Sequence, residues 1–264
     1  MLRIADHGLV TELRMATSFF GRGMVWASAF YVDGVLVDAG PPRTAPALAE
    51  WLRNHPLKIA VNTHAHEDHV GGDYLLPVTP LAPAASLERL AHPPRIQPFR
   101  HLAWGRARPV AAQPLGPSVD AGSLHFEILP TPGHSDDHVV FVEPEHGWAF
   151  TGDLFVSDRI HYAQADEDVL EAMGSMRRAL EADFEEIYCG HAGRVPDGKN
   201  ALRRKIQFLE DVRGRALRLR EQGLDEAAIA RQVFGRLGNW HWITGGWFSE
   251  VNLIHQLLGD EDAG

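Results

Sequence analysis

The sequence predicts a layered α/β protein, and three observations support that class. Short apolar runs typical of buried strands recur through the first three quarters of the chain, and longer segments repeat apolar residues at helical spacing. The strand runs come first and are followed by mixed strands and helices, an order that suits packed layers. The chain has 264 residues with 45% hydrophobic content, enough for one large domain or for one domain with an appendage.

The expected elements follow from local patterns. Residues 30–38 are predicted to form a hairpin, because Asp33-Gly34 between two apolar runs is a two-residue turn sequence. Residues 45–54 carry apolar side chains at i, i+3 and i+4, and the many prolines at 77–117 exclude one long element there. The elements are a hairpin at 30–38, a helix at 45–54, a strand at 59–61, loops around one short helix near 86–91, strands at about 123–130, 138–143 and 148–151, a helix at about 166–181 and a strand at about 185–189.

The composition changes after His191, where helical patterns replace strand patterns. We therefore divide the chain into a first domain at 1–196 and a helical C-terminal extension at 197–264. The helices expected in this extension lie at 199–222, 224–234 and 250–258.

An aromatic cluster surrounds Gly245-Gly246 in the extension. Large aromatic side chains of this kind could line an apolar pocket, form the core of the helices or mediate a dimer contact. The sequence leaves these alternatives open, and a homodimer is one of them. The members of the cluster are Trp240, Trp242, Trp247 and Phe248.

The first helix of the extension is basic. Residues 199–220 hold eight Lys and Arg residues against two acidic ones. Such a face could bind nucleic acid or an anionic substrate, although a solvated helix surface is the simpler interpretation. The formal net charge of −10 disfavours broad nonspecific binding to nucleic acid or to an anionic membrane.

Three features favour a cytoplasmic protein. Residues 1–10 lack the basic region and apolar stretch of a signal peptide. No run approaches the roughly 18 apolar residues that would suggest a membrane span, so we expect no membrane association. The single cysteine, Cys189, excludes an intrachain disulfide and fits a reducing compartment.

The segment Thr63–Gly72 carries most of the predicted chemistry. The imidazoles of His64, His66 and His69 and the carboxylate of Asp68 fall within six positions, directly after a predicted strand. Imidazole nitrogen and carboxylate oxygen are ligands that zinc, iron and manganese accept. Alternate positions on an extended segment point the same way, so His64 and His66 can serve one site.

Three later pieces repeat this arrangement of a strand followed by a glycine-bearing turn and a ligand. They are Pro132-Gly133-His134, Thr151-Gly152-Asp153 and Cys189-Gly190-His191. Together with His-x-His-x-Asp-His at 64–69, they make the chain resemble the metallo-β-lactamase-fold hydrolases over roughly residues 10–195. The resemblance implies a four-layer αββα sandwich, here with a C-terminal helical extension.

The resemblance also implies two metal sites that share one carboxylate. Paired divalent cations lower the pKa of bound water toward neutrality, so that a metal-bound hydroxide can attack an ester-like bond. Asp68 would receive the proton and pass it to the leaving group, and Asp153 would bridge the cations. Zinc is the default metal, and the same ligands accept iron and manganese. The implied ligands are His64, His66 and His134 for the first metal, Asp68, His69 and His191 for the second, and Asp153 for both.

Asp68-His69 together with Asp153 matches glyoxalase-II-like, lactonase-like and ribonuclease-like members, and we assign the resemblance to the glyoxalase-II-like and lactonase-like branch. This branch implies a small-molecule substrate with a thioester or lactone bond. Antibiotic-hydrolysing members typically lack the bridging aspartate, so we do not expect β-lactamase activity. The residues with which glyoxalase II grips glutathione are missing after His191, and Leu154-Phe155 stands where lactonases place a tyrosine.

The sequence also offers two further candidate site residues and two alternative functions. His138 could orient a ligand or bond to backbone at the start of a strand. Tyr162 is the nearest substitute for the lactonase phenol, but a structural role for it is favoured. One alternative function is a metal-dependent ribonuclease or phosphodiesterase that uses the basic helix at 199–220. The other is a non-catalytic metal-binding protein.

Overall fold

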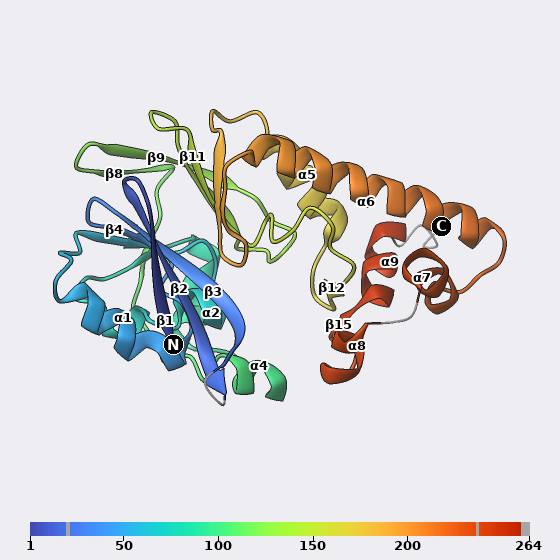
Figure 1. Ribbon diagram of the computed structural model, residues 1–264, viewed down its shortest axis with the longest axis horizontal. Helices are drawn as coiled ribbons and strands as arrows, with labels where there is room; N and C mark the ends of the chain where they lie inside the picture. Colours follow the sequence, from blue (N-terminus) through green and yellow to red (C-terminus); the bar gives the residue numbers. More distant parts are fainter. Residues whose placement is uncertain (20–21, 236–237, 260–264) are drawn as a thin grey trace.

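Two β-sheets packed face to face, with helices on both outer surfaces, form the protein (Figure 1). The computed structural model describes residues 1–19, 22–235 and 238–259. Helix α1 (Ala45–Leu52) lies against one sheet, and α5 (Val169–Ala179) and α6 (Gly198–Glu221) lie on the side away from it (Figure 1). The four-layer αββα arrangement predicted from the sequence is therefore confirmed.

The first sheet keeps its strands in chain order. Neighbours are antiparallel up to β4 and parallel from β4 to β7. The predicted hairpin is correct, since Val32 pairs with Val35 and both turn residues have positive φ, 44° at Asp33 and 85° at Gly34. Its strands are β1 (Leu2–His7), β2 (Val10–Phe19), β3 (Arg22–Val32), β4 (Val35–Val37), β5 (Ile59–Val61), β6 (Leu81–Ala82) and β7 (Gln113–Pro114).

The second sheet has the order β14-β13-β11-β10-β9-β8. Strands β11 and β13 run parallel, so their carboxyl ends meet at one edge of the sheet. The strands predicted at 123–130, 138–143, 148–151 and 185–189 are all present. The bounds are β8 (Ser118–Ala121), β9 (Leu124–Pro130), β10 (Val139–Glu143), β11 (Trp148–Gly152), β13 (Glu186–Cys189) and β14 (Gly193–Val195).

Short polar side chains begin several of the helices. Asp168, Asp225 and Ser249 each accept a hydrogen bond from a backbone N–H three residues later, at the start of α5, α7 and α9. The region 77–117 contains more structure than the single short helix that was predicted, because α4 and short strands also form there. The helices are α1 (Ala45–Leu52), α2 (Glu67–Val70), α3 (Leu87–Ala91), α4 (Pro98–Ala103), α5 (Val169–Ala179), α6 (Gly198–Glu221), α7 (Glu226–Phe234), α8 (Asn239–Ile243) and α9 (Glu250–Leu258). A small sheet joins β12 (Ala163–Gln164) to β15 (Phe248–Ser249), and 3-10 turns lie at Pro42–Thr44, Asp73–Leu75 and Ala84–Ser86.

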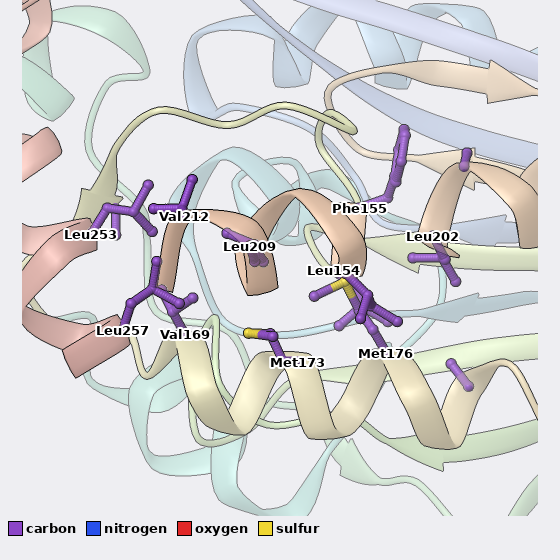
Figure 2. Packing of buried hydrophobic residues seen from close by; sticks show 14 of the residues in the cluster. Leu154, Phe155, Val169, Met173, Met176, Leu202, Leu209, Val212, Leu253 and Leu257 are labelled. Atoms are coloured by element: carbon purple, nitrogen blue, oxygen red, sulfur yellow. The ribbon is translucent and has the colours of Figure 1, made fainter. Parts of the chain in front are cut away.

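Separate apolar clusters fill the spaces between the layers. Aromatic rings such as Phe30, Phe150 and Tyr188 pack between the sheets. A second cluster joins α1 to the outer face of the first sheet. A third joins the second sheet to α5, α6 and α9 (Figure 2). The residues labelled there are Leu154, Phe155, Val169, Met173, Met176, Leu202, Leu209, Val212, Leu253 and Leu257.

The third cluster extends across residue 196, where the sequence analysis divides the chain. Lys205 of α6 is buried and donates to the carbonyl oxygens of Leu154 and Phe155 at 2.9 and 2.7 Å. At least one of the basic side chains at 199–220 therefore lies in the interior of the protein and not on its surface. The division into 1–196 and 197–264 stays a prediction, and residues 260–264 lie outside the described residues. Within the described ranges, no helix combines the length and apolar character needed to cross a membrane.

Candidate metal centre

The seven predicted ligand residues meet at one edge of the sandwich, between the ends of the two sheets. The 64–69 segment follows β5 in the first sheet, where a short extended stretch leads into α2. In the second sheet, His134 lies in the turn between β9 and β10. Asp153 directly follows β11, and His191 follows the parallel strand β13 after Gly190. The topology thus brings together residues that are more than 120 positions apart at the extremes.

Three imidazoles form the first group. The Nε2 atoms of His64 and His134 each lie 3.0 Å from Nδ1 of His66. One ring nitrogen from each residue lies within 4.8 Å of the others, which is a group that could hold a metal ion. His64 is completely buried, and His134 is nearly so.

The second group lies beside the first. His69, His191 and Asp68 offer ligand atoms within 4.8 Å of one another, and Nε2 of His191 is 3.5 Å from Oδ2 of Asp68. Asp153 stands between the groups. Its Oδ2 atom is 3.4 Å from Nε2 of His134 and 3.2 Å from Nε2 of His191, and its Oδ1 atom is 3.3 Å from Nε2 of His69. One carboxylate therefore faces both groups, as a bridging ligand would.

Unsatisfied atoms at the centre fit bound cations. His69 Nε2 and Asp153 Oδ1 are buried and have no hydrogen-bond partner among the described residues. The pKa values of His64 and His66 lie well below the usual histidine value, because burial lowers them and nearby imidazoles lower them further. Both rings are then neutral, the form in which imidazole binds metals. The donor set, the burial and these unpartnered atoms all fit divalent metal ions.

Asp38 orients two of the histidines. Its Oδ2 atom lies 2.7 Å from Nδ1 of His69, and its Oδ1 atom accepts from the backbone N–H of Thr63 at 2.8 Å. The Thr63 hydroxyl also bonds to this carboxylate and lies 3.0 Å from Nδ1 of His64. Sequence reasoning missed Asp38, although a polar residue at the carboxyl end of β4, parallel to β5, was an available signal.

A second carboxylate, which is partly buried, holds His134. Glu167 Oε1 lies 2.6 Å from Nδ1 of His134, and Glu167 Oε2 accepts from the backbone N–H of Gln164. The Gln164 side chain also accepts from Arg100, which forms a two-pronged ion pair with Glu67 at 2.7 and 2.9 Å. These contacts join α4 and β12 to Glu67 in the ligand-bearing segment at 63–72, and none was predicted from the sequence.

His138 contacts the backbone of a ligand residue. Its Nε2 atom accepts from the N–H of Asp153 at 3.1 Å, and its Nδ1 atom pairs with the Thr131 hydroxyl at 2.8 Å. Burial lowers its pKa to about 3, which keeps Nε2 free of a proton and able to accept. His191 is held in a comparable way, since its Nδ1 atom lies 2.7 Å from the carbonyl oxygen of Trp26.

Two glycines permit this close packing. A Cβ atom on Gly190 would lie 2.6 Å from Cε1 of His69 and 2.9 Å from Oδ1 of Asp153. A Cβ on Gly152 would lie 2.7 Å from both Nε2 of His138 and the hydroxyl of Thr63, and its φ of 47° also disfavours other residues. The glycine-bearing turns noted in the sequence thus have a steric cause.

The aromatic cluster borders the centre through Tyr162. The Tyr162 ring lies 5.7 Å from the ring of Phe248 and 6.4 Å from that of Trp240. Tyr162 also lines a small cavity of about 50 Å³ together with Asp153. Trp242 points elsewhere, with 73% of its surface exposed. The cluster thus divides into a wall near the site and an exposed part on α8.

A cleft of about 830 Å³ opens beside the first histidine group. His66 and His134 form part of its wall, and Trp247 lies at another part. Its volume lies in the range typical of small-molecule sites. Residues 89–108, which supply much of the remaining wall, contain five arginines and no acidic residue. Prolines dominate the sequence pattern of this region, and its positive charge was not predicted.

The fold and this cluster of histidines and carboxylates define a class of metal-binding α/β sandwich, and comparison with known proteins identifies the family. The family model described as the metallo-beta-lactamase superfamily matches residues 28–191. The chain therefore belongs to the metallo-beta-lactamase superfamily, as its motifs predicted.

Curated relatives include two kinds of thioester hydrolase. A hydroxyacylglutathione hydrolase of Legionella pneumophila (strain Lens) is 31% identical over 147 residues, covering 53% of this chain and 50% of the relative. A thioesterase of Emericella nidulans is 27% identical over 176 residues, covering 65% of this chain and 46% of the relative. The chain thus spans about half the length of the curated relatives it matches.

Solved structures share the fold at low identity. A metallo-beta-lactamase family protein from Thermus thermophilus has a TM-score of 0.68 at 17% identity, covering 97% of this chain and 94% of that one. A metallo-beta-lactamase from Pontibacter korlensis has a TM-score of 0.62 at 19% identity, covering 80% and 99%. The first of these similarities includes the C-terminal helical part.

Proposed function

We propose that the protein is a dinuclear metal-dependent hydrolase of small thioesters, with lactones as the related second substrate class. The observation that carries the proposal is the position of Asp153, whose two oxygens face both groups of histidines. The curated relatives named as thioester hydrolases support the choice of bond. The adjacent cleft supports a small-molecule substrate.

The ligand roles follow the two groups described above. When bound, two divalent cations would lower the pKa of a water molecule and polarise the substrate carbonyl. Zinc suits the mixed imidazole and carboxylate donors, and iron or manganese would be accepted. In this proposal His64, His66 and His134 hold one cation, Asp68, His69 and His191 hold the other, and Asp153 contacts both.

The remaining residues would hold this arrangement and move protons. Asp68 is the carboxylate proposed to receive a proton from the attacking water and return it to the departing thiolate. Asp38 and Glu167 fix the rings of His69 and His134 through their Nδ1 atoms. His138 fixes the backbone of Asp153. No serine or cysteine nucleophile is required, and Cys189 is fully buried.

The test is a comparison of initial rates on several bond types with metal-loaded protein. The panel contains an acyl-glutathione thioester, simple lactones, bis-nitrophenyl phosphate and a short RNA. We expect thioester hydrolysis to be fastest, and metal analysis to give two ions per chain. Faster phosphodiester cleavage would favour the ribonuclease alternative, and no turnover on any substrate with metals bound would favour a non-catalytic protein.

A pair of variants tests the role of Asp153. Asp153→Ala should abolish hydrolysis while the circular dichroism spectrum stays that of the folded protein. Asp211→Ala, on the exposed surface of α6, is the matched control and should keep full activity. Full activity in Asp153→Ala would contradict the proposal.

A further inference from the structure

The cleft beside the candidate metal centre carries a concentration of positive charge in an acidic protein. Residues 89–108 contain five of the chain's 25 Lys and Arg residues, although the formal net charge is −10. All five arginines line the cleft that also contains His66 and His134. The arginines are Arg89, Arg95, Arg100, Arg106 and Arg108.

Two of these arginines are paired with carboxylates of the protein. Arg100 is buried against Glu67, and Arg89 bonds to both carboxylate oxygens of Asp136. These pairs connect the wall of the cleft to the ligand-bearing segment at 63–72 and to the turn after His134. Arg89 and Arg100 therefore stabilise the wall of the cleft, because a protein carboxylate already balances the charge of each guanidinium group.

The other three arginines, Arg95, Arg106 and Arg108, are exposed, and no protein carboxylate pairs with them among the described residues. Arg95 and Arg106 are exposed and have no ion pair or hydrogen bond from their side chains within the described ranges. Arg108 stacks over the ring of Tyr74 at 4.5 Å, a contact that uses the face of the guanidinium group and not its N–H donors. Asp166, the other carboxylate on the wall, forms no ion pair with any described arginine. The outer cleft therefore offers several uncommitted N–H donors.

The backbone that carries these side chains is anchored. Trp104 is buried, and its carbonyl oxygen accepts from the backbone N–H of Arg43. At the far end of the segment, the N–H of Val110 donates to the carbonyl oxygen of Leu90 at 2.9 Å. The positions of Arg106 and Arg108 between these anchors are fixed by the fold, so a charged ligand need not order the segment first.

From this cleft we infer that the thiol half of the substrate carries phosphate groups, as in a coenzyme A thioester, and that Arg95, Arg106 and Arg108 bind them. The inference rests on the thioester hydrolysis proposed above. Several guanidinium groups around one hollow match phosphate, because each presents a planar fork of donors to a multiply charged oxyanion. The acyl carbon would lie at the histidines while the phosphates occupy the outer cleft.

The experiment compares one acyl group on four thiols: coenzyme A, 4′-phosphopantetheine, pantetheine and glutathione. The test variant is Arg95→Gln/Arg106→Gln, and the control is Arg203→Gln/Arg218→Gln on the exposed face of α6, with the same change in charge. We expect the test variant to raise KM for the coenzyme A ester about tenfold, leave kcat unchanged, and leave the pantetheine ester unaffected. Added salt should raise KM for the coenzyme A ester only in the unmodified protein and in the control.

The four thiols separate the possible contacts. Loss of affinity for the phosphopantetheine ester as well assigns the contact to the phosphate nearest the thiol, and loss confined to the coenzyme A ester assigns it to the nucleotide phosphates. An unchanged KM for both, an equal rise for all four esters, or an effect confined to the glutathione ester would overturn the inference.

Binding measured without turnover separates this inference from the proposed function. Calorimetric titration with S-propyl-coenzyme A, a thioether that cannot be hydrolysed, should give binding that the test variant weakens about tenfold and the control does not. Arginine-dependent binding in a protein that hydrolyses no thioester would refute the proposed function and keep the phosphate site. No binding of the thioether would refute the site itself.

Discussion

Glu167 Oε1 lies 2.6 Å from Nδ1 of His134, and the same carboxylate accepts through Oε2 from the backbone N–H of Gln164. A carboxylate can only accept, so Nδ1 carries the proton, and the neutral ring then presents the lone pair of Nε2 to the other ligand atoms. The geometry of the candidate metal centre thus involves a residue on the loop that precedes α5, a part of the chain without any candidate ligand.

Glu167→Gln should weaken metal binding without unfolding the protein. The amide has one acceptor oxygen where the carboxylate uses two, so either His134 or Gln164 loses its partner. Loss of such an orienting contact typically costs about 10- to 100-fold in metal affinity, which competition with a chromogenic chelator would measure. Glu171→Gln, on the exposed face of α5, is the control and should leave the affinity unchanged. Equal affinity in both variants would show that Glu167 does not orient the ring.

Arg100→Met should destabilise the fold strongly, because it leaves the charge of Glu67 buried without its partner. Arg100 and Glu67 are 7% and 4% exposed, and breaking a buried pair typically costs about 3–5 kcal/mol. Adding Glu67→Gln should recover part of that loss, since no unpaired charge remains. Urea unfolding of the single and the double variant measures the two free energies of unfolding to be compared.

Arg177→Met is the matched control for that prediction. Arg177 pairs with Glu210 at 2.7 Å, but both side chains are about half exposed. Such a pair contributes less than about 1 kcal/mol. A similar loss of unfolding free energy in Arg100→Met and Arg177→Met would mean that breaking the buried Arg100 pair costs no more than breaking an exposed pair.

The stability contribution of Asp73 should fall as pH rises. Burial raises the pKa of this carboxyl well above its usual value, against the lowering effect of the hydrogen bond from Asn62. The folded chain therefore holds the proton to a higher pH than the unfolded chain. Its contribution is complete below the unfolded pKa of about 3.9, and it is lost as pH rises toward the folded pKa. Asp73→Asn cannot ionise, so its stability relative to the unmodified protein should increase with pH. A difference in unfolding free energy that stays flat with pH would contradict the raised pKa.

The sequence predicted the strands that lead into ligand turns, because each is an apolar run that ends shortly before a polar ligand residue, and three of the four have a glycine directly before that ligand. It did not predict β1, β2 or most of β3. In β2 the buried side of the strand includes Glu12, whose carboxylate bonds to Ser28 and His7, and this charge breaks the apolar alternation. Strand β1 is largely exposed and has no apolar run at all.

The candidate ligands could be found from the sequence because four of them lie within six positions and the others repeat one local pattern. Spacing along the chain could not reveal the residues that orient them. Asp38 meets His69 across 31 positions, while Glu167 meets His134, and Arg100 meets Glu67, across 33. Each looks like an ordinary polar residue until the fold brings it to the ligand, so spacing carries no signal.

Gly190→Ala should disturb the metal centre more than the fold. The added Cβ would lie 2.6 Å from Cε1 of His69 and 2.9 Å from Oδ1 of Asp153, and the His69 ring cannot move freely because Asp38 holds its other side. We expect metal affinity to fall by at least about tenfold, as for other changes that displace ligands, measured by chelator competition. Gly174→Ala is the control, since the nearest atom to its new Cβ is Arg178 Nη1 at 3.5 Å. That change in α5 should keep the metal affinity and raise stability by up to about 1 kcal/mol. Unchanged affinity in Gly190→Ala would mean that the ligands can shift to make room, and that the close packing at this turn is not required for binding.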